Sequence, residues 1–187
     1  MHTNKLLSRI SRADMTYTTE SASTIFSNRF DSSTQFADAV PATIALFKRL
    51  SVDDQLALLW YAYTEMGRSI TPAAPGAARL QLAEGLLNQI KKMSHGEQLQ
   101  VMRDLAANRN TAISRSYGVL SANTKLAFWY ELSVLMEQGI VVPMPPGYQP
   151  TAAVTEVLET IKNLDFGQQI TVLRSTVVDM GVDPLAE

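Results

Sequence analysis

The sequence predicts an all-helical protein, because apolar residues recur at helical spacing, capping residues precede these runs, and strand-like alternation is not sustained. Leu56, Leu59, Trp60, Tyr63 and Met66 follow the spacing of a single helix face. The short β-branched run at 140–142 is the nearest approach to a strand. We therefore expect helices through most of the chain.

The first two helices are expected between residue 36 and Gly67. Pro41 stands in a first helical turn, where proline is tolerated, and apolar residues at helical spacing follow it. Ser51 with Asp54 three positions later fits a capping-box variant that opens the second helix. Gly67 is the expected end of that helix.

Two further helices have equally clear starts. Ser94 and Glu97 form a capping box ahead of apolar residues at helical spacing. Ser121 or Asn123 opens another helix, which carries a tryptophan and should end at Gly139.

The chain also contains an internal repeat at an offset of 69 to 71 residues. Four blocks match in the same order: 51–56 with 121–126, Trp60-Tyr61 with Trp129-Tyr130, the proline–glycine turns 72–76 with 143–147, and 96–103 with 167–174. The repeat predicts two related helical halves, about 40–110 and 111–182, packed or interleaved as two bundles. Ligands commonly bind at such a seam, and both tryptophans are expected to face it.

Composition argues against most catalytic and nucleic-acid functions. The formal net charge is −2, and the chain has no cysteine. His2 and His95 lack metal-ligand spacing, and neither a glycine-rich phosphate loop nor a Gly-x-Ser-x-Gly motif occurs. We therefore expect no enzyme, no metal site and no nucleic-acid partner. Because no apolar run reaches about 18 residues, we expect a cytoplasmic protein without a transmembrane segment.

Domain boundaries follow from the same patterns. Residues 1–35 are rich in Ser and Thr, contain neither Gly nor Pro, and show no sustained period, which predicts a flexible or loosely docked arm. Residues 36–182 form the expected helical domain, and 183–187 a short tail.

The apolar stripes allow two interpretations. An ordinary core explains them, and so does a channel for an apolar ligand. Tryptophan and tyrosine suit the edge of such a channel, where one end of a guest meets solvent. Methionine, present eight times, suits an irregular apolar slot. Periodicity does not choose between these interpretations or name a ligand.

Several segments resemble a known family: VPATIALFKRLS (40–51), DQLALLWYAYTEMG (54–67), AAPGAA (73–78), KLAFWYEL (125–132), PPGY (145–148) and GQQITVLRSTVVDMG (167–181). They are similar to the carotenoid-binding N-terminal domain of the cyanobacterial orange carotenoid protein, over nearly all of residues 35–182. Because the chain ends at Glu187, where that family continues into a second domain, it resembles the stand-alone helical carotenoid proteins.

The resemblance implies two interleaved four-helix bundles that hold a keto-carotenoid non-covalently: canthaxanthin, echinenone or 3'-hydroxyechinenone. Carried over by position, the pigment contacts are Leu56, Leu59, Trp60, Tyr63, Pro75, Met93, Met102, Leu126, Trp129, Met136, Ile140, Met144, Ile170, Thr171 and Val177. Helical spacing alone also singles out several of these, among them both tryptophans.

The implied function is photoprotection through quenching of singlet oxygen by the pigment. Two alternatives stay open. One is docking on the phycobilisome to drain its excitation, with Arg174 as the partner contact and a location at the thylakoid-facing antenna. The other is a carrier that hands carotenoid to a partner, such as a separate carotenoid-carrier domain.

Overall fold

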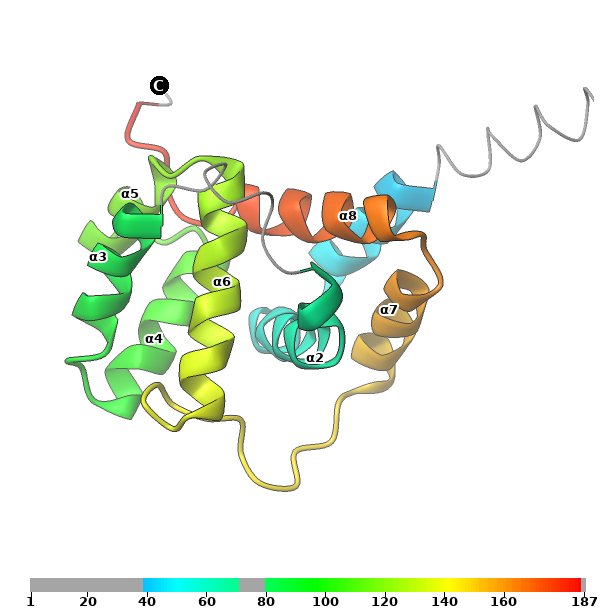
Figure 1. Ribbon diagram of the computed structural model, residues 1–187, viewed down its shortest axis with the longest axis horizontal. Coiled ribbons are helices and arrows are strands. Elements are labelled where there is room, and N and C mark those ends of the chain that lie inside the picture. Colours follow the sequence, from blue (N-terminus) through cyan, green and yellow to red (C-terminus); the bar gives the residue numbers. More distant parts are fainter. Residues whose placement is uncertain (1–38, 71–79, 186–187) are drawn as a thin grey trace, which may run out of the picture. The chain divides into compact units, whose positions relative to one another are not determined.

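Helices make up the regular structure of the chain, as Figure 1 shows for the described residues, 39–70 and 80–185 of the computed structural model. A helix over residues 39–49 is followed by α2 (Val52–Ile70), α3 (Leu80–Ile90), α4 (His95–Ala106), α5 (Ala112–Gly118), α6 (Ala122–Glu137), α7 (Ala152–Lys162) and α8 (Phe166–Val178). Within these ranges there is no strand, so the all-helical prediction is confirmed. The predicted arm 1–35 and the turn containing Pro72 and Pro75 lie outside the described residues.

The predicted helix starts agree with the structure. At α4, the Glu97 main-chain N–H donates to Ser94 Oγ (3.4 Å) while the Ser94 N–H donates to Glu97 Oε2 (2.8 Å), which completes the capping box. Ser121, rather than Asn123, caps α6 by accepting from the Thr124 N–H.

The two predicted helix ends had different outcomes. Gly139 follows the C-cap of α6 with a φ of 70°, which is the left-handed backbone conformation that commonly ends an α-helix. Gly67 does not end α2, which continues to Ile70. A glycine ends a helix only where the chain turns away, and inside a helix it is merely a weak helix former. The predicted end at Gly67 was therefore wrong.

The sequence repeat corresponds to a repeat of helices. By residue position, α2 matches α6, α3 matches α7, and α4 matches α8. The helices divide into two groups in Figure 1: α3, α4, α5 and α6 on one side, and the 39–49 helix, α2, α7 and α8 on the other. Within these groups α3 packs on α6, and its counterpart α7 packs on α2. Each bundle therefore combines helices from both halves, so the halves are interleaved.

The two bundles are joined at a seam formed by α2, α4, α6 and α8. Helix α2 contacts α4 and α6, and α6 contacts α8. Buried Lys125 of α6 donates from Nζ to the carbonyl of Val178 (2.7 Å) at the end of α8. Burial lowers the pKa of this lysine. Within the second bundle, Lys48 of the 39–49 helix forms an ion pair with Asp179 (2.6 Å), directly after α8.

Candidate functional site

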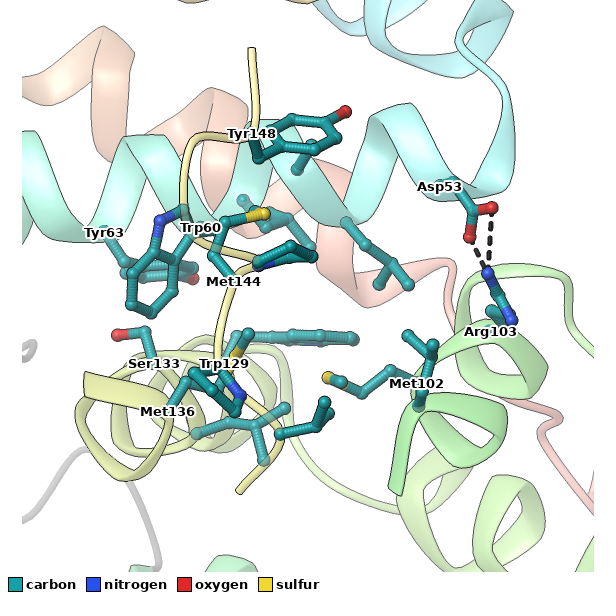
Figure 2. A pocket seen from close by; sticks show the side chains of 18 residues that line it. Asp53, Trp60, Tyr63, Met102, Arg103, Trp129, Ser133, Met136, Met144 and Tyr148 are labelled. Carbon is teal, nitrogen blue, oxygen red and sulfur yellow. Dashed lines mark hydrogen bonds and ion pairs between the residues drawn. The ribbon is translucent and has the colours of Figure 1, made fainter. Parts of the chain in front are cut away.

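An apolar pocket of about 240 Å³ lies at the seam of the two bundles, and Figure 2 shows it at close range. Three helices and the segment after α6 form its walls. We call residues 142–148 of that segment the strap. The lining is Asp53, Leu56, Ala57, Leu59, Trp60 and Tyr63 from α2; Leu99, Met102 and Arg103 from α4; Trp129, Leu132, Ser133 and Met136 from α6; and Val142, Pro143, Met144, Pro145 and Tyr148 from the strap.

Trp129 is held rigidly on one wall of the pocket. Its Nε1–H donates to Tyr117 Oη (2.9 Å), and that hydroxyl donates in turn to the carbonyl of Val177 (2.8 Å). Its indole also lies edge-on to Phe128, at 5.7 Å between ring centroids. The polar group of Trp129 is therefore satisfied inside the protein, and the indole offers the pocket an apolar surface.

Trp60, the repeat counterpart of Trp129, has a different environment. It is half-buried, and within the described ranges no atom accepts a hydrogen bond from its Nε1. Figure 2 shows the indoles of Trp60 and Trp129 reaching toward the same space from two different helices. The related halves thus supply one fixed and one less constrained indole to the same pocket.

Tyr63 is buried beside Trp60, on the same wall. Its Oη donates to the carbonyl of Leu126 (3.3 Å), and its ring lies edge-on to Tyr130. Burial raises the pKa of Tyr63 far above its ordinary value, so the side chain remains a neutral phenol. It adds no charge to the pocket.

Charged groups are confined to one side of the pocket. Arg103 donates from Nε to Asp53 Oδ1 (2.7 Å) and from Nη2 to Asp53 Oδ2 (3.0 Å), a two-point pair drawn in Figure 2. The hydrogen bond to Asp53 raises the pKa of Arg103. Both side chains are partly exposed, so the pair marks the solvent side of an otherwise apolar pocket.

Eight predicted contact residues line this pocket: Leu56, Leu59, Trp60, Tyr63, Met102, Trp129, Met136 and Met144. Their side chains are rings, aliphatic groups and thioethers, a lining that fits a long apolar guest. The structure therefore brings together residues separated by up to 88 positions in the sequence.

The other described candidates lie elsewhere. Leu126 and Val177 are buried in the core, Met93 and Ile170 are half-buried, and Ile140 and Thr171 are exposed. Thr171 bonds from its hydroxyl to the Gly167 carbonyl (2.8 Å) of its own helix. Pro75 falls outside the described residues. As pigment contacts, these residues remain a prediction.

Sequence reasoning missed several site residues. Tyr117 lies in a seven-residue helix that is too short to show a clear hydrophobic period. The Asp53–Arg103 pair joins residues 50 positions apart. For the strap, the signal was its proline–glycine composition, and Met144 alone of its residues was among the predicted contacts.

The described residues contain no group of three His, Cys, Asp or Glu side chains that could hold a metal ion. Among the same residues, no helix is long and apolar enough to cross a membrane.

Comparison with known proteins decides the family. The family model described as "Orange carotenoid protein, N-terminal" matches residues 33–183. A Nostoc sp. (strain PCC 7120) protein named "Orange carotenoid-binding domain-containing protein" is 70% identical over 173 residues, covering 92% of this chain and 100% of that protein. The chain belongs to the orange carotenoid protein N-terminal family. The predicted resemblance is confirmed.

Longer members of the orange carotenoid protein family match along part of their length. The "Orange carotenoid-binding protein" of Synechocystis sp. is 54% identical over 167 residues, which is 89% of this chain and 51% of that protein. The chain thus spans about half the length of this relative.

Solved members of the family share the fold. The orange carotenoid protein of Anabaena (Nostoc) sp. PCC 7120, in a structure binding canthaxanthin, is 59% identical with a TM-score of 0.72, over 79% of this chain and 48% of that one. The red carotenoid protein of the same organism, also binding canthaxanthin, is 42% identical with a TM-score of 0.69, over 76% of this chain and 97% of that one.

Proposed function

We propose that this chain binds a keto-carotenoid (canthaxanthin, echinenone or 3'-hydroxyechinenone) non-covalently in the seam pocket and protects against light damage through it. The observation that carries the proposal is an apolar pocket lined by two repeat-related tryptophans, in a family with two solved members whose structures bind canthaxanthin. The bound pigment would accept energy from singlet oxygen and release it as heat.

The energetics favour tight binding. A long polyene exposes several hundred Å² of apolar surface, so its burial contributes on the order of 10 kcal/mol at about 25 cal/mol/Å². Loss of ligand and side-chain freedom offsets part of this gain. Pockets for drug-sized ligands measure about 300–1,000 Å³, and the seam pocket holds about 240 Å³. A carotenoid would therefore extend beyond it, toward residues such as Met93 and Ile140.

In this proposal the protein supplies solubility, a fixed pigment conformation and controlled exposure, and the photophysics belongs to the pigment. We expect no enzymatic activity and no nucleic-acid partner. We also propose residues 36–182 as the carotenoid-binding domain, 1–35 as an arm and 183–187 as a tail.

The test is the visible absorption spectrum of the protein purified from cells that make canthaxanthin. We expect a band red-shifted from free pigment that co-elutes with the protein, and we expect the complex to quench singlet oxygen. Leu59→Asp should abolish the band by placing a charge in the pocket wall, whereas Leu82→Asp, on the exposed face of α3, should leave it unchanged. A colourless but folded protein would refute the proposal.

Arg174 favours a second candidate function, which is docking on a protein partner. Its Nε is buried and has no hydrogen-bond partner in the described part of the chain. The repeat counterpart, Arg103, has the carboxylate of Asp53, but Asn123 occupies the position equivalent to Asp53. An arginine without its carboxylate suits an acidic group from a partner, either the phycobilisome or a separate carotenoid-carrier domain.

Antenna fluorescence separates these alternatives. If the pigmented protein docks on the phycobilisome, at the thylakoid-facing antenna, it lowers the antenna's fluorescence, and Arg174→Glu removes this effect. Arg49→Glu is the matched charge reversal on the exposed face of the 39–49 helix and should leave the effect intact. Transfer of pigment to an apo acceptor would instead indicate a carrier, and absence of both effects leaves quenching of singlet oxygen alone.

A further inference from the structure

Two glutamines occupy equivalent positions in the internal repeat, Gln98 in α4 and Gln169 in α8. Gln169 Nε2 donates to the carbonyls of Lys162 (3.3 Å) and Leu164 (3.0 Å), at the end of α7. Gln98 Nε2 likewise donates to the carbonyls of Ile90 and Met93 (3.2 Å each), at the end of α3. Each glutamine therefore satisfies carbonyl groups at the end of the preceding helix.

Gln98 makes two further bonds that Gln169 does not make. Its Oε1 accepts a hydrogen bond from the main-chain N–H of Val142 (2.7 Å), and its Nε2 lies 3.3 Å from the carbonyl of Ile140. Gln98 is 1% exposed, so water does not compete readily for these bonds. The first residue of the strap is therefore bonded to a buried side chain of α4.

The rest of the strap is weakly attached. Pro143, Pro145 and Pro146 have no N–H to donate. Between Val142 and Tyr148, no main-chain group bonds to a helix in the described structure. At the far end, Tyr61 Oη donates to the carbonyl of Tyr148 (3.3 Å). The strap nonetheless supplies one wall of the pocket, as Figure 2 shows for Met144 and Tyr148.

We propose that Gln98 is a positioning residue that holds the strap against the pocket, and that release of the Val142 N–H opens the strap so that pigment enters or leaves. The inference rests on the proposed function. Opening leaves the buried Gln98 Oε1 without its hydrogen-bond donor, which is costly, so the closed strap is favoured and opening is infrequent. Gln169, whose bonds stop at the end of α7, has no part in this role.

The internal repeat supplies the control for a test on the pigment-free protein. Gln98→Met and Gln169→Met each remove two bonds to a helix end, but only the former frees the strap. Hydrogen exchange of the Val142 amide should accelerate about tenfold or more in Gln98→Met and change by less than about twofold in Gln169→Met. Release of canthaxanthin from the loaded variants into detergent micelles should follow the same order.

Unchanged Val142 exchange in a folded Gln98→Met protein would overturn the proposal, as would equal acceleration of exchange or of pigment release in both variants. If Gln98→Met fails to fold, the wild-type protein decides. The Val142 amide should exchange at least about 100-fold more slowly than the Met144 amide, and equal rates would overturn the proposal. The exchange experiment needs no pigment, so it tests the role of Gln98 separately from the proposed function. If the wild-type protein bound no canthaxanthin, the proposed function would be refuted, and exchange of the Val142 amide would still show whether Gln98 holds the strap.

Discussion

Tyr117→Phe tests whether a side chain outside the pocket fixes one of its walls. The substitution removes a hydroxyl that accepts from Trp129 Nε1 (2.9 Å) and donates to the Val177 carbonyl (2.8 Å). That carbonyl retains the Met180 N–H (3.3 Å), so the main loss is the buried indole N–H. An unsatisfied buried donor costs about 1–3 kcal/mol, and we expect the free energy of unfolding to fall by about 2 kcal/mol.

Urea unfolding followed by circular dichroism measures this change, with Tyr63→Phe as the matched control. Tyr63 is also buried, but its hydroxyl makes one longer bond, to the Leu126 carbonyl (3.3 Å). We expect the control to lose less stability than Tyr117→Phe. A double-mutant cycle with Trp129→Phe should give a coupling energy of about 1–2 kcal/mol between the indole and the hydroxyl.

Two results would refute this reasoning. One is a Tyr117→Phe protein within about 0.5 kcal/mol of wild type, which is the range of neutral surface substitutions. The other is a coupling energy near zero. With pigment bound, the freed indole should also shift the absorption maximum.

Trp60→Ala should weaken canthaxanthin binding at least about tenfold in a pigment titration. It should also destabilise the fold less than Trp129→Ala, because Trp60 is only half-buried whereas Trp129 is buried, and equal destabilisation would contradict this. Gly118→Ala should lower the free energy of unfolding by about 1–3 kcal/mol, because its Cβ would overlap a main-chain carbonyl. Gly85→Ala, at an open helix position, should raise the free energy of unfolding by about 1 kcal/mol. A Gly118→Ala protein that unfolds at a higher temperature than Gly85→Ala would refute both glycine predictions. The hydrogen bond from the Ser94 side chain lowers the pKa of Glu97. The ionised Glu97 side chain therefore stabilises the fold fully above its unfolded pKa of about 4.3, and this stabilisation is lost as the pH falls through the lower folded pKa. On acidification to about pH 3, Glu97→Gln should therefore lose less stability than the wild-type protein. An equal loss of stability in the two proteins would exclude this role for Glu97.

Local signals predicted the helices well because their causes are local. Capping at Ser94 and Ser121 involves atoms three residues apart, and the structure contains both caps. The end of α2 was missed because Gly67 stops a helix only if the chain beyond it turns. The repeat predicted two related halves, but it left open whether they pack side by side or interleave.

The site was predictable to the extent that it depends on helix faces. Trp60 and Trp129 were expected at the seam, and both line the pocket. The bond between Tyr117 and Val177, 60 positions apart, could not be predicted, because helical spacing shows which face is buried and not what covers it. The attachment of the strap to Gln98 escaped prediction for the same reason.

Interleaving also bears on how such a chain arises. A polypeptide with one half alone, residues 39–110, would leave α3 without the α6 surface and α2 without the α7 surface that cover them here. Two copies that exchanged helix pairs would restore both bundles as a domain-swapped homodimer with exact two-fold symmetry. The link between α4 and α5, where Asn108 adopts a φ of 53°, would then be the fusion that turned this dimer into a monomer. Gene fusion would free the two halves to diverge, so that one symmetric indole pair became a fixed Trp129 and a less constrained Trp60.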